Sequence, residues 1–288
     1  MSTDGAALLA RKTWRTAEPL HGMIYFVPEA AEAYAALGIT GRDGYFASRA
    51  APMGAVSAEV VISTFFNFNP ELVHAAIPKA WATTTPEALV AARFAAVDGA
   101  FRRLIGDDAV QSDEMRLAAG LARAMAEKAS THIEGRPLCA GHAQLPWPEA
   151  PHLVLWHAQS ILREYRGDAH IALLVTHGLS GLDALLTHAA GGDVPAEILR
   201  TTRGWSHEDW IAAADSMRSR GWLTDSDDLA FTDRGRRVPP GDRRPDRPVV
   251  GGPVCRARRG RLRQAPYPDP PVEQNVLRGS VPLRDPVR

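Results

Sequence analysis

Residues 180–237 read SGLDALLTHAAGGDVPAEILRTTRGWSHEDWIAAADSMRSRGWLTDSDDLAFTDRGRR and carry the most specific structural pattern in the chain. Ser180 and Asp183 form a capping pattern that predicts the start of a helix, and the glycine pair at 191–192 predicts its end. A proline then opens a second, short helix over 196–202. A serine and an aspartate three residues apart repeat the capping pattern and predict a third helix over 210–220, which a glycine closes.

A short β-hairpin is predicted directly after the third helix. Trp222-Leu223-Thr224 and Leu229–Thr232 are apolar segments on either side of the acidic turn Asp225–Asp228. Three helices joined by short turns and followed by a hairpin predict a winged helix. The run RSRGWL…LAFTDRGRR resembles the winged helix of MarR-type regulators, in which the last helix ends in an Arg-Gly pair and the wing ends in Thr-x-x-Gly-Arg.

The residues before this stretch are predicted to be almost entirely helical. Ala-rich segments carry apolar residues three and four positions apart, which is typical of helices with one buried face. The clearest segments are 28–37, 86–105, 113–131 and 153–166. Four prolines between 137 and 151 indicate a boundary. We therefore expect a mainly α protein: an N-terminal helical domain over 1–144 packed on a helical plus winged-helix domain over 145–237.

The last segment, 238–288, has a different composition. From residue 236 onward the chain contains 13 Arg, 5 acidic residues and 11 of the 22 prolines, whereas residues 1–235 have a net charge of −8. Such a segment cannot bury enough apolar surface to order its backbone. We expect an irregular basic tail, which is either a disordered arm or the translation of a shifted reading frame.

Composition limits the cellular environment. Cys139 and Cys255 are the only cysteines, which argues against a disulfide scaffold and a cysteine-rich zinc site. No apolar run is long enough for a membrane span, and no secretory signal is visible. We expect a cytoplasmic protein without a membrane partner.

Four further segments extend the resemblance beyond the winged helix. They are EPLHGMIYFVPEA (18–30), GYFASRAAPMG (44–54), LPWPEAPHLVLWHA (145–158) and LREYRGDAHIALL (162–174). Together they resemble an actinobacterial family of helix-turn-helix-domain proteins, over residues 10–236. That family has no established activity, so the resemblance implies a fold and names no chemistry. Its members usually continue into another helix, which this tail does not match.

The charges of the predicted winged helix disfavour DNA binding. In regulators of this fold the third helix enters the major groove, but here it begins Ser206-His207-Glu208-Asp209-Trp210. Two carboxylates would repel phosphates, Trp210 is too bulky to read base edges, and the wing is acidic. Against this, acids are ordinary at a helix start, and a dimer could concentrate basic charge from Arg200, Arg203, Arg218 and Arg220.

The first candidate site lies near the N-terminus. Glu18, His21 and Tyr25 share one face if the segment is helical, which would place a carboxylate, an imidazole and a phenol together. Arg49, alone among small residues before a proline turn, is a further candidate. A buried histidine that bonds a backbone carbonyl would explain His21 equally well.

The second candidate site lies in 156–170. Trp156, Arg163 and Arg166 follow helical spacing, and Gly167 is predicted to end that helix. Asp168 would then cap the next helix, with His170 in its first turn. An Arg–Asp–His cluster suits an anionic or polar ligand, because arginine binds carboxylates through two hydrogen bonds. Alternatively, Arg163 and Asp168 only lock a helix corner and Trp156 is core.

These observations favour a small-molecule-binding protein built on a degenerate winged helix. Its ligand would lie in a pocket between the helical regions, oriented by His21, Tyr25, Arg49, Trp156, Arg163, Asp168 and His170. The sequence leaves open whether a reaction occurs; for an enzyme, His21 or His170 would be the acid or base. The sequence does not identify a cofactor, and we expect no metal ion. The alternatives are a MarR-like, ligand-responsive regulator, acting as a homodimer on DNA, and a protein-interaction module.

Overall fold

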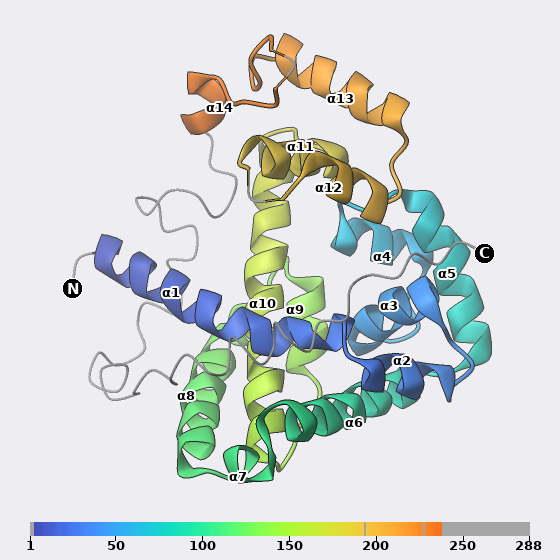
Figure 1. The fold of residues 1–288 in the computed structure, drawn as a ribbon, viewed down its shortest axis with the longest axis vertical. Coiled ribbons are helices and arrows are strands. Elements are labelled where there is room, and N and C mark those ends of the chain that lie inside the picture. The colour runs from blue at the N-terminus through green and yellow to red at the C-terminus, as the bar shows by residue number, and fades with distance from the viewer. Residues whose placement is uncertain (1–2, 193, 227, 238–288) are drawn as a thin grey trace.

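The computed structural model describes residues 3–192, 194–226 and 228–237 (Figure 1). The predicted tail 238–288 lies outside them. The described part is mainly helical, as predicted. Its first half contains α1 (Thr3–Gly22), α2 (Pro28–Ala35), α3 (Gly41–Ala50), α4 (Ala58–Phe65), α5 (Pro70–Thr83), α6 (Pro86–Ile105), α7 (Asp107–Val110), α8 (Asp113–Ala129) and α9 (Pro137–Ala143), with short 3₁₀ helices η1 (Met23–Tyr25) and η2 (Ala51–Met53).

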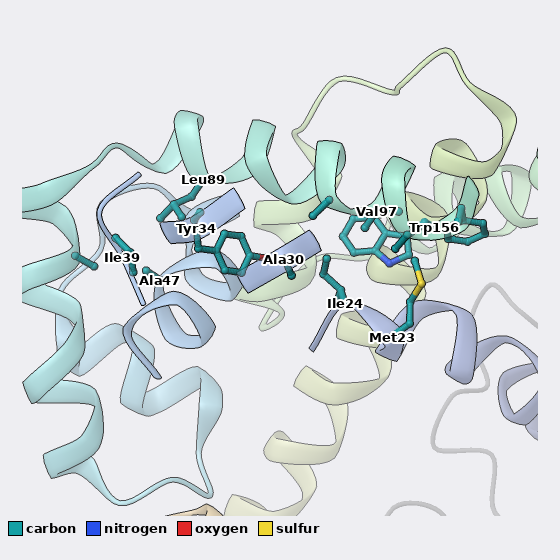
Figure 2. Packing of buried hydrophobic residues seen from close by; sticks show 14 of the residues in the cluster. Met23, Ile24, Ala30, Tyr34, Ile39, Ala47, Leu89, Val97 and Trp156 are labelled. Atoms are coloured by element: carbon teal, nitrogen blue, oxygen red, sulfur yellow. The ribbon is translucent and has the colours of Figure 1, made fainter. Parts of the chain in front are cut away.

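The long helix α10 (Pro151–Thr176) runs through the middle of the molecule (Figure 1). It packs against α8 and α9 along its length, and α1 crosses it. Near its start, Trp156 is buried in a core that η1, α2, α3 and α6 complete. Figure 2 shows Trp156 in this core with Met23 and Val97. The region before residue 144 and the helix after it therefore share one core.

Gly167 does not end a helix, so this prediction was wrong. Helix α10 continues through it for nine more residues, to Thr176. A glycine inside a helix costs only about 1 kcal/mol relative to alanine, and burial of Tyr165 before it and Leu174 after it offsets that cost. Asp168 and His170 consequently lie on the same helix as Arg163, rather than across a corner from it.

The proline-rich segment 137–151 contains a helix of its own. Pro137 starts α9, whose Leu138 and Cys139 are fully buried. Gly141 of this helix lies so close to η2 that an added Cβ would be 2.8 Å from the Pro52 carbonyl oxygen. The segment therefore packs against the helices before it, and we call residues 3–178 the body of the molecule. The domain limits at 144 and 237 stay a prediction.

The C-terminal unit, residues 179–237, follows the sequence expectation closely. It contains α11 (Gly181–Ala190), α12 (Ala196–Thr202), α13 (His207–Ser219) and α14 (Asp233–Arg237) at the end of α10 (Figure 1). Ser180 and Asp183 form the predicted capping box. The hairpin is reduced to one antiparallel bridge, Leu223 to Phe231. Trp210 was expected on the groove-facing side of the third helix, but it is buried in the core of this unit.

A short loop of the body holds the C-terminal unit in place. The Asn69 backbone N–H donates to the Arg203 carbonyl at 2.9 Å, and its side chain donates to the Gly204 carbonyl at 3.0 Å. The Trp205 indole donates to the Asn67 carbonyl at 3.0 Å. Phe66 begins this loop with a φ of 53°, a left-handed conformation that is costly for a bulky residue.

Among the described residues, no single helix is long and apolar enough to cross a bilayer. Helices α10 and α11 meet that criterion only when taken together, across a bend of 102°.

Replacing Gly181 by alanine should loosen the C-terminal unit from the body. A Cβ on Gly181 would overlap the carbonyl oxygen of Phe66, which is backbone and cannot rotate away. We expect Gly181→Ala to lower the free energy of unfolding by about 1–3 kcal/mol, as overpacking does. Urea denaturation followed by circular dichroism measures this change.

The matched control is Gly120→Ala on the exposed face of α8, where an added Cβ meets nothing within 4 Å. It should raise the free energy of unfolding by roughly 0.5–1 kcal/mol. Equal stabilities of Gly181→Ala and the wild type would show that the unit does not rest on Phe66.

Candidate functional site

A pocket of about 220 Å³ lies where the C-terminal unit meets the body. We call it the junction pocket. Helices α3, α4, α10 and α11 and the loop after α4 form its walls, and Arg203 extends into it from the end of α12. The side chains that line it are Tyr45, Arg49, Thr64, Phe65, Phe66, Asn67, Phe68, Arg163, Glu164, Arg166, Asp168, His170, Ile171, Leu174, Ala184, His188 and Arg203, together with Gly167.

A buried ion network forms the inner end of the junction pocket. Glu164 accepts from Arg163 at 2.8 Å and from Arg49 at 3.4 Å through the same oxygen, Oε1. Arg163 also donates to Glu18 at 3.1 Å. The Glu164 side chain is 6% exposed and that of Arg49 is 11% exposed. The network thus ties α1, α3 and α10 together at one point.

The network shifts the ionisation of the groups around it. Burial alone would raise the pKa of Glu164, but the Arg49 and Arg163 guanidiniums outweigh it and hold this pKa at about 2. Burial would likewise raise the pKa of Tyr25, yet the charges of Arg163, Arg49 and Arg93 lower it. A lowered phenol pKa indicates that positive charge exceeds negative charge at this point of the molecule.

Three of the predicted site residues lie behind the junction pocket rather than in its lining. His21 is 1% exposed, its ring stacks on Trp156 at 5.4 Å, and its Nε2 lies 2.9 Å from Ser160 Oγ. Burial, followed by the charge of Arg163, lowers the pKa of His21 well below its usual value. Tyr25 is in edge contact with the same imidazole. His21, Tyr25 and Trp156 therefore pack next to the network without lining the pocket.

Asp168 does not pair with Arg163, which corrects the predicted helix corner. Its Oδ2 accepts the Cys139 backbone N–H at 2.9 Å and so caps the start of α9. Burial raises the pKa of Asp168 to about 6, against the lowering effect of that hydrogen bond. Its neighbour His170 lines the pocket beside His188, with ring centroids 6.5 Å apart. Burial lowers the pKa of His170 to about 4.

Of the predicted site residues, Arg49, Arg163, Asp168 and His170 line the pocket. The sequence analysis missed Glu164, which also lines the pocket, and Arg93, which is buried outside the lining. Glu164 belongs to a four-residue repeat on the buried face of α10, which reads Trp156, Ser160, Glu164 and Asp168. Arg93 is 3% exposed and donates to the Ser48 carbonyl at 2.9 Å. It lies four residues from both Leu89 and Val97. The four-residue spacing to buried positions is therefore the signal that could have identified both charged residues as inward-facing.

No metal centre is apparent in the part of the chain that the structure describes. Nowhere in it do three or more His, Cys, Asp or Glu side chains gather closely enough to hold an ion.

A second buried group, formed by His142 and His157, lies next to the network. His157 is fully buried between Trp147, at 4.8 Å between ring centroids, and Phe94, at 5.6 Å. Neither of its ring nitrogens has a hydrogen-bond partner among the described residues. Burial lowers the pKa of His157 from 6.5 to about 4 and that of His142 to about 3. Both imidazoles are therefore neutral at pH 7.

His157 should make the protein acid-sensitive. Because its pKa is lower in the folded state, the stability that its neutral form contributes is complete above pH 6.5 and is lost as the pH falls toward 4. The loss for this group is about 3 kcal/mol. We expect His157→Gln to reduce the fall in unfolding free energy over that interval, measured by urea denaturation at a series of pH values.

His132→Gln, at an exposed position after α8, is the control and should leave the pH dependence unchanged. An identical pH dependence in His157→Gln and the wild type would refute the assignment.

Comparison with known proteins gives one match. Residues 10–239 match the model of a helix-turn-helix family. A search of curated proteins and a search of solved structures each found no match. The family match covers about four fifths of the 288 residues, including the whole C-terminal unit and the residues that line the junction pocket. The chain therefore belongs to this helix-turn-helix family.

Proposed function

We propose that this protein binds a small organic molecule in the junction pocket, and that its helix-turn-helix unit is a winged helix of the MarR type serving as scaffold. The order of α11, α12, α13 and a hairpin supports the winged helix. The bridge between Leu223 and Phe231 is formed by two hydrogen bonds, from the Thr224 N–H to the Ala230 carbonyl at 2.9 Å and from the Thr232 N–H to the Trp222 carbonyl at 3.1 Å.

One observation carries the binding proposal. The junction pocket gathers ionisable side chains from α3, α10, α11 and the end of α12 in a recess whose inner end is buried. Burying charges costs several kcal/mol per ion unless they are well paired, so such clusters concentrate at functional sites. Phe66, whose left-handed backbone is also costly, lines the same recess. A concave site with a few convergent polar groups is the usual form of a small-molecule site.

The surface of α13 supports the view that this unit is not a DNA reader. Glu208, Asp209 and Asp215 are exposed along the helix, and Asp225 and Asp228 are exposed in the hairpin. Non-specific DNA affinity comes from neutralised phosphates. An acidic face makes this contribution unfavourable.

The arginines that could have offset this acidity have partners within the protein. Arg200 pairs with Glu197, Arg218 with Asp215, and Arg220 with Asp183, at 2.7, 2.8 and 2.9 Å. Arg203 faces the junction pocket.

A DNA-binding regulator is the second candidate, and family membership favours it. In that case the junction pocket would be an effector site. Because α11 and Arg203 contribute to its wall, a bound effector would contact both the body and the C-terminal unit.

Filling the junction pocket should abolish ligand binding. Ile171 lines the pocket, whereas Ala172 next to it is exposed. We expect fragments that bind the wild type, detected by ligand-observed NMR at millimolar concentration, to be lost in Ile171→Trp and retained in Ala172→Trp. A library in which no fragment distinguishes Ile171→Trp from the wild type would contradict the proposal.

The DNA alternative is tested by fluorescence anisotropy of a labelled duplex in about 50 mM salt. A chain ending at Arg237 should show no binding up to about 100 µM, the weak end of ordinary non-specific affinity. The full chain is the comparison, because the 11 Arg after residue 237 would attract any polyanion. Micromolar binding by the shorter chain that weakens steeply with salt would instead establish the regulator.

A further inference from the structure

Arg203 brings a cation into the junction pocket from the C-terminal unit. Its guanidinium lies over the ring of Phe68, with 4.6 Å between Cζ and the ring centroid. Nη1 donates to the Thr202 hydroxyl at 3.1 Å, while Nε is buried without a hydrogen-bond partner. The backbone carbonyl of Arg203 is held by Asn69, so the residue has a fixed position at the pocket wall.

Among the described residues, no acid compensates the charge of Arg203. Within residues 3–192, 194–226 and 228–237, no carboxylate forms an ion pair with it. Burial lowers the pKa of Arg203, and the positive charges of Arg49 and Arg163 lower it further. A partly buried guanidinium that faces other guanidiniums is electrostatically unfavourable without a counter-charge.

Arg49 and Arg203 lie over neighbouring rings of one aromatic cluster. The Arg49 guanidinium is 4.2 Å from the Phe65 ring centroid. The rings of Phe65 and Phe68, which carry the two arginines, are 6.4 Å apart, and Tyr45 is 5.6 Å from Phe68. Two guanidinium groups and an apolar floor are thus presented together at the pocket.

The acids in the pocket wall are committed elsewhere. Glu164 is shared between Arg49 and Arg163, and Asp168 caps α9. Arg203 pairs with neither of these two carboxylates.

We infer that the junction pocket binds a small organic anion, whose carboxylate or phosphate group pairs with Arg203 and Arg49 and whose apolar part contacts Phe66 and Ile171 in the pocket wall. Arginine suits this role because its planar fork donates two parallel hydrogen bonds to such groups. The volume of about 220 Å³ falls below the 300–1,000 Å³ or so of pockets for drug-sized ligands, which favours a compact molecule. This inference rests on the proposed function and specifies its ligand class.

The test is titration calorimetry on the full chain with probes that differ only in charge. Benzoate and hexanoate are the acids, benzamide and hexanamide are their neutral counterparts, and phenyl phosphate and inorganic phosphate complete the set. We expect at least one organic anion to bind and its neutral counterpart not to bind. Arg203→Gln should weaken that binding about tenfold or more, and Arg203→Lys should restore part of it.

Arg116→Gln is the charge-matched control, because it removes one positive charge from the exposed surface of α8. It should bind the anion as the wild type does. Circular dichroism of each variant shows whether it folds, and the Lys variant keeps the test valid if the Gln variant does not.

Each result either supports or contradicts the anion inference. Tighter binding of phenyl phosphate than of benzoate would support a phosphate ester, and the reverse order would support a carboxylate. Equal affinity for acid and amide, unchanged affinity in Arg203→Gln, binding of inorganic phosphate alone, or no binding of any probe would overturn the anion inference. If Ile171→Trp abolishes binding of neutral fragments while these acids fail, the proposed function stands and only the ligand class is wrong.

Discussion

Glu164 is bound by two arginines that come from different parts of the chain, and the arrangement of the molecule depends on this contact. Arg163 precedes it on α10, whereas Arg49 comes from α3 and Glu18, the second partner of Arg163, from α1. Removing one partner of a buried pair leaves an uncompensated charge, which typically costs 3–5 kcal/mol. Small shifts of α1 or α3 along α10 would break the network, so it selects one packing of these helices over neighbouring ones.

The same contact explains why a recess exists at this place. Arg49 and Glu164 bring charged side chains into the contact between α3 and α10, and their paired groups form the inner end of the recess. The C-terminal unit then completes the recess, because the loop at 66–69 fixes Arg203 and Trp205 through backbone hydrogen bonds. The junction pocket is consequently a product of both regions and would not form in either alone.

Much of the fold was predictable because its signals are local. Caps such as Ser180 and helix starts such as Pro86 act within one turn, and the structure has them as predicted. The errors came from tertiary packing. Gly167 was predicted to end a helix, but α10 continues through it because burial of the residues on either side stabilises the helix. The candidate site could be predicted only in part. The sequence indicated Arg163 and Asp168 but suggested that they pair with each other. In the structure Arg163 binds Glu18 and Asp168 binds the N-terminus of α9, both of which are distant in the chain.

The distribution of arginine is the main argument for the proposed function over the DNA-binding alternative. A helix-turn-helix unit that binds DNA needs cations on the outer face of its third helix, where phosphates can reach them. Here Arg218 and Arg220 bind Asp215 and Asp183, and the exposed charges of α13 are acidic. Arg203, in the turn before α13, points into the molecule instead. Arg234 and Arg236 of the unit are exposed in α14, whereas Arg203 is directed at the junction pocket. Under the proposed function, an anion small enough to enter that pocket is the partner that Arg203 fits.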